Sequence, residues 1–367
     1  MPGITTRRKW IKKAAAAVAA VSITPSLFAT ERERYRAAGI ILLNSNENAY
    51  GPSAAAQKAM AEALSGSNRY PDEQIPALKQ QIAEFWGVGK ENILMGAGSS
   101  EILGLTSLLV SSVKGHVITA EPSYRVWNSQ AEAFGLSFKR IPLAADKTHD
   151  LSGMMSAMDA GTRMMYVCNP NNPVGIYVEN HLLRTFAEEC SKKCMVLVDE
   201  AYTEFAGLPS LQDIAVGNPN VMIAKTFSKI YGLAGARVGY AIAHPDTIKK
   251  LGNLQPWNDV SVSMVTAAAA SAALKDQAFV KDCREKTRQA REMCYDCFKQ
   301  LSLDYIPSYT SFILFNIDKI GSDFSKKMQA KNIFVQYREH FGGKWCRVSM
   351  GTLEEMQQFC SALKEIA

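Results

Sequence analysis

Residues 195–202 read MVLVDEAY and residues 221–229 read VMIAKTFSK. In each stretch a short apolar run, typical of a buried strand, ends in polar side chains. The runs at 117–119, 164–168 and 238–242 have the same character, and amphipathic stretches such as 100–112 and 179–192 separate them. Apolar strands that alternate with helices predict an α/β domain in which a mostly parallel sheet lies between helices.

The side chains that follow these strands are the candidates for chemistry, because ligands of such sheets bind beyond the carboxyl ends of the strands. Asp199 and Tyr202 follow one strand, Ser228 and Lys229 follow the next, and NPNNPVG at 169–175 follows a third. Taken singly these are weak signals, since a lysine after a strand is usually a solvated charge and Asn-Pro is usually a turn. Their order along the chain is more specific than any one of them.

The last part of the chain has a different pattern of charged and apolar residues. A long charged helix is expected at 276–300, followed by strands at 312–317, 333–337 and 345–350. This pattern predicts a smaller α+β domain over 276–367, beside a large domain over 51–275 and an N-terminal arm over 30–50 that joins the small domain.

The first 29 residues are interpreted as an export signal. Basic residues crowd positions 7–13, no acid precedes Glu31, and an Ala/Val-rich run too short to span a bilayer follows. The pair Arg7-Arg8 resembles a twin-arginine (Tat) signal, which predicts a periplasmic or exported protein with no stable membrane association once the signal is removed. If this interpretation fails, the expected location is cytoplasmic. The remaining chain is nearly neutral, which argues against a nucleic-acid surface.

Metal and disulfide sites are not expected. The chain has eight cysteines and five histidines, without ligand spacing between them. Cys294 and Cys297 form a CxxC, but it lies in a charged helical stretch.

The ordered set Asn172, Asp199, Tyr202, Lys229 and Arg237 resembles the cofactor site of fold-type I pyridoxal-phosphate aminotransferases of class I/II. Three further blocks resemble the histidinol-phosphate aminotransferase branch: LNSNEN at 43–48, RYPD at 69–72 and RVSMG at 347–351. The similarity extends from about residue 42 to the C-terminus. It implies the cofactor pyridoxal 5'-phosphate, held as an imine (aldimine) on Lys229.

The resemblance also implies roles for the polar residues. Lys229 would be the amine and proton shuttle, Asp199 would keep the pyridine nitrogen protonated, and Tyr202 with Asn172 would hold the phenolate oxygen. The ring would stack on Tyr124. The phosphate would be bound by a guanidinium, by hydroxyl groups and by a glycine-rich turn before a helix, which together comprise Arg237, Thr226, Ser228, Gly98, Ser99 and Ser100.

Substrate and partner residues follow from the same resemblance. Arg347 would bind the substrate α-carboxylate, because its planar fork fits that group. Asn172 and Tyr50 are further substrate-binding candidates. Tyr70 would reach the cofactor phosphate of a partner subunit, so the resemblance implies a homodimer.

The expected activity is transamination from an amino acid or related amine to a 2-oxo acid. Two alternatives stay open: a decarboxylase or lyase of the threonine-phosphate decarboxylase type, and a pyridoxal-phosphate binding protein without turnover. The donor, the acceptor and the pathway do not follow from the sequence. Gln336 occupies the place where the branch has a phosphate-binding arginine, and Arg338 lies two residues on. A weak or absent reaction with histidinol phosphate is therefore expected, with preference for an unphosphorylated amino acid. Tyr50, Trp127 and Tyr337 make an aromatic amino acid a candidate.

Overall fold

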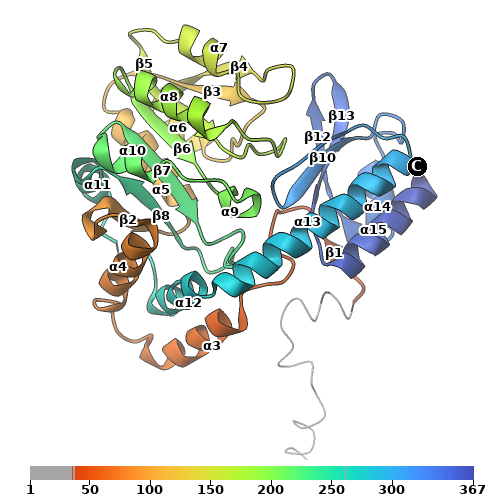
Figure 1. Cartoon of the computed structure of the whole chain (residues 1–367), viewed down its shortest axis with the longest axis horizontal. Helices are drawn as coiled ribbons and strands as arrows, with labels where there is room; N and C mark the ends of the chain where they lie inside the picture. Colours follow the sequence, from red (N-terminus) through yellow and green to blue (C-terminus); the bar gives the residue numbers. More distant parts are fainter. Residues whose placement is uncertain (1–34, 36–37, 260) are drawn as a thin grey trace, which may run out of the picture.

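The large domain is built on a sheet of seven strands within the part of the chain that the computed structural model describes, residues 35, 38–259 and 261–367. The order across this sheet is β2-β8-β7-β6-β5-β3-β4 (Figure 1). The strands are β2 (Ile93–Gly96), β3 (Gly115–Glu121), β4 (Leu136–Pro142), β5 (Thr162–Cys168), β6 (Met195–Asp199), β7 (Val221–Thr226) and β8 (Gly239–Ala243).

All of these strands run parallel except β8, which is antiparallel to both β2 and β7. The sequence reasoning had grouped 238–242 with the parallel strands and had missed β2 and β4. The run of apolar residues does not encode direction, because an antiparallel strand in the middle of a covered sheet is buried on both faces like its neighbours. The reversal of β8 places its first residue, Gly239, at the carboxyl end of β7, opposite Thr226.

Helices cover both faces of the sheet. One face packs on α4, α8 and α12, and the other on α5, α6 and α11. Alternate strand residues serve the two cores, as in β6, where Val196 and Val198 face one core and Leu197 faces the other. The helices of the large domain are α3 (Ala54–Ala63), α4 (Gln74–Trp86), α5 (Ser99–Val110), α6 (Asn128–Ala133), α7 (Leu151–Ser156), α8 (Asn180–Ser191), α9 (Thr203–Ala206), α10 (Gln212–Gly217), α11 (Pro245–Gly252) and α12 (Met264–Lys275).

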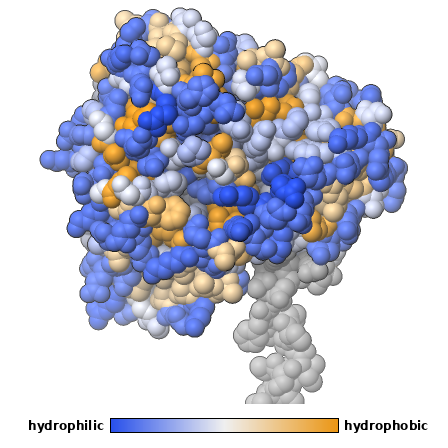
Figure 2. Space-filling view, viewed as in Figure 1, coloured by the Kyte–Doolittle hydropathy of each residue, from blue (hydrophilic) through white to orange (hydrophobic). Residues whose placement is uncertain are grey.

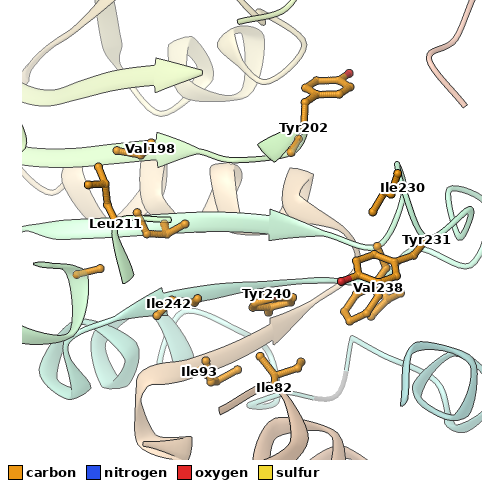
Figure 3. Close-up of a cluster of buried hydrophobic side chains, with 14 of the residues drawn as sticks. Ile82, Ile93, Val198, Tyr202, Leu211, Ile230, Tyr231, Val238, Tyr240 and Ile242 are labelled. Atoms are coloured by element: carbon orange, nitrogen blue, oxygen red, sulfur yellow. The ribbon is translucent and has the colours of Figure 1, made fainter. Parts of the chain in front are cut away.

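Figure 3 shows how the first of these cores reaches the carboxyl ends of the strands. Val198 lies within β6 and Tyr202 lies just past its end, while Tyr240 and Ile242 of β8 pack beside Ile93 of β2. The apolar core therefore holds the ends of the strands from beneath, up to the point where polar side chains begin.

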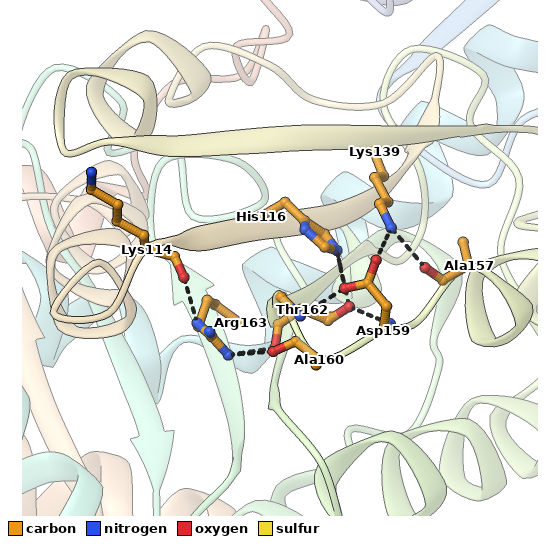
Figure 4. Close-up of polar contacts among 9 residues, drawn as sticks. Lys114, His116, Lys139, Ala157, Asp159, Ala160, Thr162 and Arg163 are labelled. Carbon is orange, nitrogen blue, oxygen red and sulfur yellow. Dashed lines mark hydrogen bonds and ion pairs between the residues drawn. The ribbon is translucent and has the colours of Figure 1, made fainter.

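The opposite edge of the sheet carries a separate polar cluster (Figure 4). Asp159, before β5, accepts a hydrogen bond from Lys139 of β4 and lies 3.5 Å from the His116 imidazole of β3. The Arg163 guanidinium donates to the carbonyl of Lys114 at 3.0 Å. This cluster ties three strands together at the end remote from the carboxyl ends.

The small domain contains a four-stranded antiparallel sheet of order β12-β13-β10-β9. Its elements are α13 (Gln277–Gln300), β9 (Tyr305–Ile306), β10 (Phe312–Asn316), α14 (Phe324–Gln329), β11 (Ile333–Phe334), β12 (Gln336–His340), β13 (Gly343–Ser349) and α15 (Leu353–Ile366). The expected strand 333–337 is in fact divided, because β11 pairs with β1 (Ile41–Leu42) whereas β12 pairs with β13. The parallel β1–β11 pairing attaches the N-terminal arm to the small domain.

Helix α13 connects the two domains (Figure 1). Asp276 caps its start by accepting from the amide of Phe279 at 3.1 Å. Val280 and Cys283 then pack in the large-domain core, while Cys294 and Phe298 pack in the small-domain core. The expected boundary at 275/276 thus coincides with a helix start, although the packing changes domains only halfway along that helix.

None of the helices in the described part of the chain combines the length and the apolar character that a membrane span requires. The face shown in Figure 2 is mainly polar, with apolar side chains scattered between polar ones. The proposed signal, residues 1–29, lies outside the described residues.

Candidate active site

A cavity of about 570 Å³ lies at the carboxyl ends of β5, β6 and β7 and is closed on its far side by β12 and β13 of the small domain. Cys168, Asp199 and Ala224 are register partners across the three parallel strands, so the segments that follow them leave the sheet side by side. This pairing brings together Asn172, Tyr202 and Lys229, which are far apart in sequence. The sequence-predicted residues that line the cavity are Ser99, Tyr124, Asn172, Asp199, Tyr202, Lys229 and Arg347.

Lys229 is half-buried in the cavity, with charges of both signs around it. Its ammonium donates to the Asn46 carbonyl at 3.2 Å and lies 5.8 Å from the centre of the Tyr202 ring. Burial, reinforced by the positive charge of Arg347, lowers the pKa of Lys229 to about 8. A lysine so perturbed is neutral often enough near neutral pH to act as a nucleophile and as a base.

Asp199 is 3% exposed and accepts from the Tyr166 hydroxyl at 3.0 Å and from the Ala201 amide at 3.2 Å. Burial raises its pKa to about 6. A buried carboxylate of this kind is well suited to a cationic partner, such as a protonated ring nitrogen, since that partner would offset the cost of its charge.

Tyr202 and Asn172 form a hydrogen-bonded group with Asn46 and Arg347. The Tyr202 hydroxyl accepts from the Asn46 amide at 3.2 Å and from the Asn172 amide at 3.4 Å. The Asn172 side-chain oxygen accepts from Arg347 at 2.7 Å, and Arg347 also donates to the Asn44 carbonyl at 3.1 Å. The Arg347 guanidinium comes from β13, so the large and small domains both contribute to this group.

The predicted phosphate-binding residues gather at the start of α5. Arg237 donates to the Ser228 hydroxyl at 3.4 Å and to the Ala97 carbonyl at 3.2 Å. The Thr226 hydroxyl accepts from the Ser228 amide at 3.0 Å. The first N–H groups of a helix have no intrahelical partner, so a guanidinium, hydroxyls and helix amides face the same place.

Two glycines make this anion site possible. Gly98 has φ +81°, and a Cβ there would come within 2.4 Å of the Arg237 guanidinium. At Gly239 a Cβ would come within 2.6 Å of the Ser99 amide nitrogen. A side chain at either glycine would therefore fill the anion site that the Arg237 guanidinium and the first amides of α5 surround. The donor set, the buried carboxylate and the nucleophilic lysine together fit pyridoxal phosphate.

Two predicted residues lie elsewhere. Tyr50 packs against the large-domain core and does not line the cavity, and Tyr70 is 67% exposed on the surface. In the single chain, neither is brought to the other site residues.

Sequence reasoning had assigned no role to Asn46 or Tyr166. Asn46 contacts both Lys229 and Tyr202, and it lies within the LNSNEN block, which was a usable signal. Tyr166 lies inside β5 and reaches Asp199 only because β5 and β6 are neighbours. No local pattern distinguishes it from a core tyrosine.

These features define an enzyme of the fold-type I pyridoxal-phosphate class. The family model for aminotransferase class I and II matches residues 38–363, and the chain belongs to this family. The histidinol-phosphate aminotransferase of Moorella thermoacetica is 35% identical over 89% of this chain and 85% of its own length. That of Brevibacillus brevis is 36% identical over 89% and 90%, respectively.

Solved structures agree. The histidinol-phosphate aminotransferase of Sinorhizobium meliloti, in complex with pyridoxal-5'-phosphate, superposes with a TM-score of 0.82 at 28% identity, covering 92% of this chain and 94% of that one. The L-threonine-O-3-phosphate decarboxylase of Porphyromonas gingivalis gives 0.77 at 20% identity over 89% and 99%, which shows a shared fold only. The chain is therefore a pyridoxal-phosphate-dependent aminotransferase that moves an amino group from an amino acid or related amine to a 2-oxo acid.

Proposed function

We propose that this aminotransferase uses an amino donor that carries a second acidic group, and that Arg338 and Arg125 bind that group at the outer end of the cavity. The proposal rests on one observation. Gln336, Arg338 and His340 alternate along β12 and all line the cavity, as side chains on one face of a strand do. Arg125, from the segment after β3, lines the same end.

The charges at this end support an acidic ligand. Among the described residues Arg338 forms no ion pair, and its guanidinium donates only to the Tyr337 carbonyl, at 3.1 Å. Burial and the charge of Arg125 lower the pKa of Arg338, so an anion between the two would be favourable. Arg125 is paired with Glu121 at 3.3 Å. Burial lowers the pKa of His340 to about 4, so at neutral pH this ring offers hydrogen bonds and no charge.

This proposal replaces the expectation of an aromatic donor. Trp127 is buried in the core between Phe138 and Tyr166, and Tyr50 packs against the large-domain core. The Tyr337 hydroxyl donates to Glu339 at 2.8 Å on the face of β12 away from the cavity lining. None of the three forms an aromatic pocket here. Gln336 does line the cavity, so the expected weakness toward histidinol phosphate, the donor for which the curated relatives are named, remains a prediction.

The chain's own residues would act as follows. The bound cofactor supplies a protonated ring that withdraws electrons from the donor's α-carbon. Lys229 would accept the proton that leaves the donor's α-carbon and would then give that proton up again. Its depressed pKa allows both steps near neutral pH. Asp199 would keep the ring nitrogen protonated, while Tyr202 and Asn172 would fix the ring's oxygen edge. Arg347 would orient the α-carboxylate, and the closing small-domain strands would exclude water.

A homodimer is part of the proposal. Tyr70 and Trp257 are 67% and 53% exposed, and their rings contact each other with centres 5.1 Å apart and planes tilted by 58°. Leu64, 62% exposed, lies nearby in sequence. Large apolar side chains exposed together favour a protein interface. The resemblance of RYPD at 69–72 makes a second copy the partner, with Tyr70 reaching that copy's cofactor phosphate. Sedimentation of the wild type tests the homodimer. Cofactor titration of Tyr70→Ala tests the contact with the phosphate, since the variant should bind the cofactor more weakly than the wild type.

Export through the twin-arginine route is also proposed, on the basis of residues 7–29 alone. It would place the folded, cofactor-loaded enzyme in the periplasm or outside the cell.

The donor proposal is tested by measuring kcat/KM for histidinol phosphate, acidic amino acids and aromatic amino acids, with spectral conversion of the bound cofactor as the readout. Losing one charge-assisted contact costs about 1.5–3 kcal/mol, or roughly tenfold to a hundredfold. Arg338→Ala should lose this factor for acidic donors and little for neutral ones. Arg184→Ala, which breaks a surface pair with Asp213, is the control. A neutral donor that outperforms all acidic ones, unaffected by Arg338→Ala, would exclude the proposal, and CO₂ release without spectral conversion would favour the decarboxylase.

A further inference from the structure

A second lysine lies directly beneath the active site. Lys225, on β7, is 1% exposed and belongs to the same short segment as Lys229. Its ammonium contacts the Glu204 carboxylate at 2.8 Å, the Thr203 hydroxyl at 2.7 Å and the Glu200 carboxylate at 3.4 Å. It also lies 4.7 Å from the centre of the Trp86 ring.

All three polar partners of this ammonium belong to one turn. The segment from Glu200 to Glu204 follows β6 directly, and it carries Tyr202 into the cavity. On the same turn, the Ala201 amide donates to Asp199 at 3.2 Å. Lys225 therefore holds, from the core side, the segment whose other side presents Asp199 and Tyr202 to the cofactor site.

The turn has further supports, and these make the lysine's contribution separable. The Glu200 amide donates to the Ala224 carbonyl at 3.0 Å, and the Glu200 carboxylate accepts from the Leu211 amide at 3.1 Å. The Arg284 guanidinium donates to the Glu204 carbonyl at 2.6 Å. Removing the ammonium would thus leave the backbone of the turn attached but its two carboxylates without their shared cation.

The charges around Lys225 also indicate that its ammonium stabilises the Glu200–Glu204 turn. The buried groups that face Lys225 are Glu200 and Glu204 from the turn, Tyr231 from the loop after Lys229, and Tyr240 from β8. Burial raises the pKa of both tyrosines, so they are neutral, and one ammonium serves two carboxylates. Breaking a buried ion pair by removing one partner leaves uncompensated charge, which the turn would relieve by moving toward solvent. Glu200 also acts on Asp199, since its charge contributes to raising the pKa of that carboxyl.

We propose that Lys225 is a positioning residue, whose ammonium fixes the Glu200–Glu204 turn so that Asp199 and Tyr202 stay aligned at the cofactor site. It does not touch the reacting atoms. Its effect reaches the chemistry through the turn, whereas the substrate carboxylate is bound independently by Arg347 from β13. Loss of the ammonium should therefore lower kcat and weaken cofactor binding, with little change in KM.

The test compares Lys225→Met, Lys225→Arg and the control Lys139→Met in the full protein. Lys139, on β4, also donates to a carboxylate, that of Asp159 before β5, but at the side of the sheet remote from the cavity (Figure 4). Lys225→Met should lower kcat by about tenfold to a hundredfold, as expected for a misplaced catalytic group. In cofactor-free protein it should speed amide exchange at residues 200–204 specifically. Lys225→Arg should restore most of both, and Lys139→Met should change neither.

Two outcomes would overturn the proposal. One is a folded Lys225→Met protein with kcat and amide exchange within about twofold of wild type. The other is an equal loss of kcat in Lys139→Met, which would show that general destabilisation is enough. If Lys225→Met does not fold, Glu204→Gln removes the shorter of the two ion pairs and is judged by the same measurements.

Discussion

Replacing Arg347 by methionine is the perturbation whose effect the structure defines most closely. The guanidinium is 8% exposed and donates at 2.7 Å to Asn172 and at 3.1 Å to the Asn44 carbonyl. If its fork binds the α-carboxylate, the variant loses two charge-assisted hydrogen bonds. At the low end these total about 3 kcal/mol, so kcat/KM should fall by more than about a hundredfold.

The assay compares an amino acid donor with the corresponding amine that lacks the carboxylate. The loss should appear for the amino acid and nearly vanish for the amine. A second readout is independent of substrate. The charge of Arg347 helps to lower the pKa of Lys229 to about 8, so the pKa of Lys229 should be higher in Arg347→Met than in the wild type. The rate at which cofactor-free protein reacts with pyridoxal phosphate should then reach its plateau at a higher pH.

Arg291 provides the control. It is also 8% exposed and donates to the Thr310 carbonyl at 2.7 Å, outside the cavity. Arg291→Met should lower stability and leave the ratio between the two donors unchanged. An equal loss for amino acid and amine in Arg347→Met would refute the assignment of the α-carboxylate to Arg347.

Three further predictions concern the cofactor and the N-terminus. Lys229→Ala should abolish both the visible absorption of bound cofactor and turnover; a variant that keeps them would show that Lys229 is not the reactive amine. Asp199→Asn should lose most turnover. Folding raises the pKa of Asp199 to about 6, so ionisation of this carboxyl destabilises the cofactor-free fold above pH 6 but not below about pH 4. In thermal unfolding, Asp199→Asn should therefore be more stable than the wild type by about 3 kcal/mol at pH 8. At pH 4 the two proteins should be equally stable. Arg7→Lys combined with Arg8→Lys should block export while the purified enzyme stays active; fractionation that finds the double variant still exported would contradict the twin-arginine proposal.

The sequence predicted the fold class because the signals for buried strands are local, and it predicted the aminotransferase activity through the resemblance of its ordered blocks to a known family. A buried parallel strand is a run of apolar residues, and its end is marked by the first polar side chains. The end of β6 at Asp199, and that of β7 at Thr226 to within two residues, could therefore be located without coordinates. The blocks around Asn172, Arg237 and Arg347 have a fixed order along the chain, and the family comparisons confirm what that order indicated.

Other features depended on which strands are neighbours, and no local pattern encodes that. The reversal of β8, the division of 333–337 between two sheets, and the hydrogen bond from Tyr166 to Asp199 all arise from strand pairing. The placement of two aromatic residues also required the tertiary structure: Trp127 is buried in one core and Tyr50 packs against another, so neither lines the cavity, and the preference for an aromatic donor loses that support without being tested.

The candidate residues for the chemistry were thus predicted from the sequence alone, because their types and order are a property of the chain, and most of those candidates line one cavity. The surroundings that tune them were decided by the tertiary structure. Burial and the guanidinium of a distant strand depress the pKa of Lys229, burial raises that of Asp199, and a turn held by Lys225 presents Tyr202. Desolvation and charge–charge interaction depend on distances between segments far apart in sequence, and only folding sets those distances.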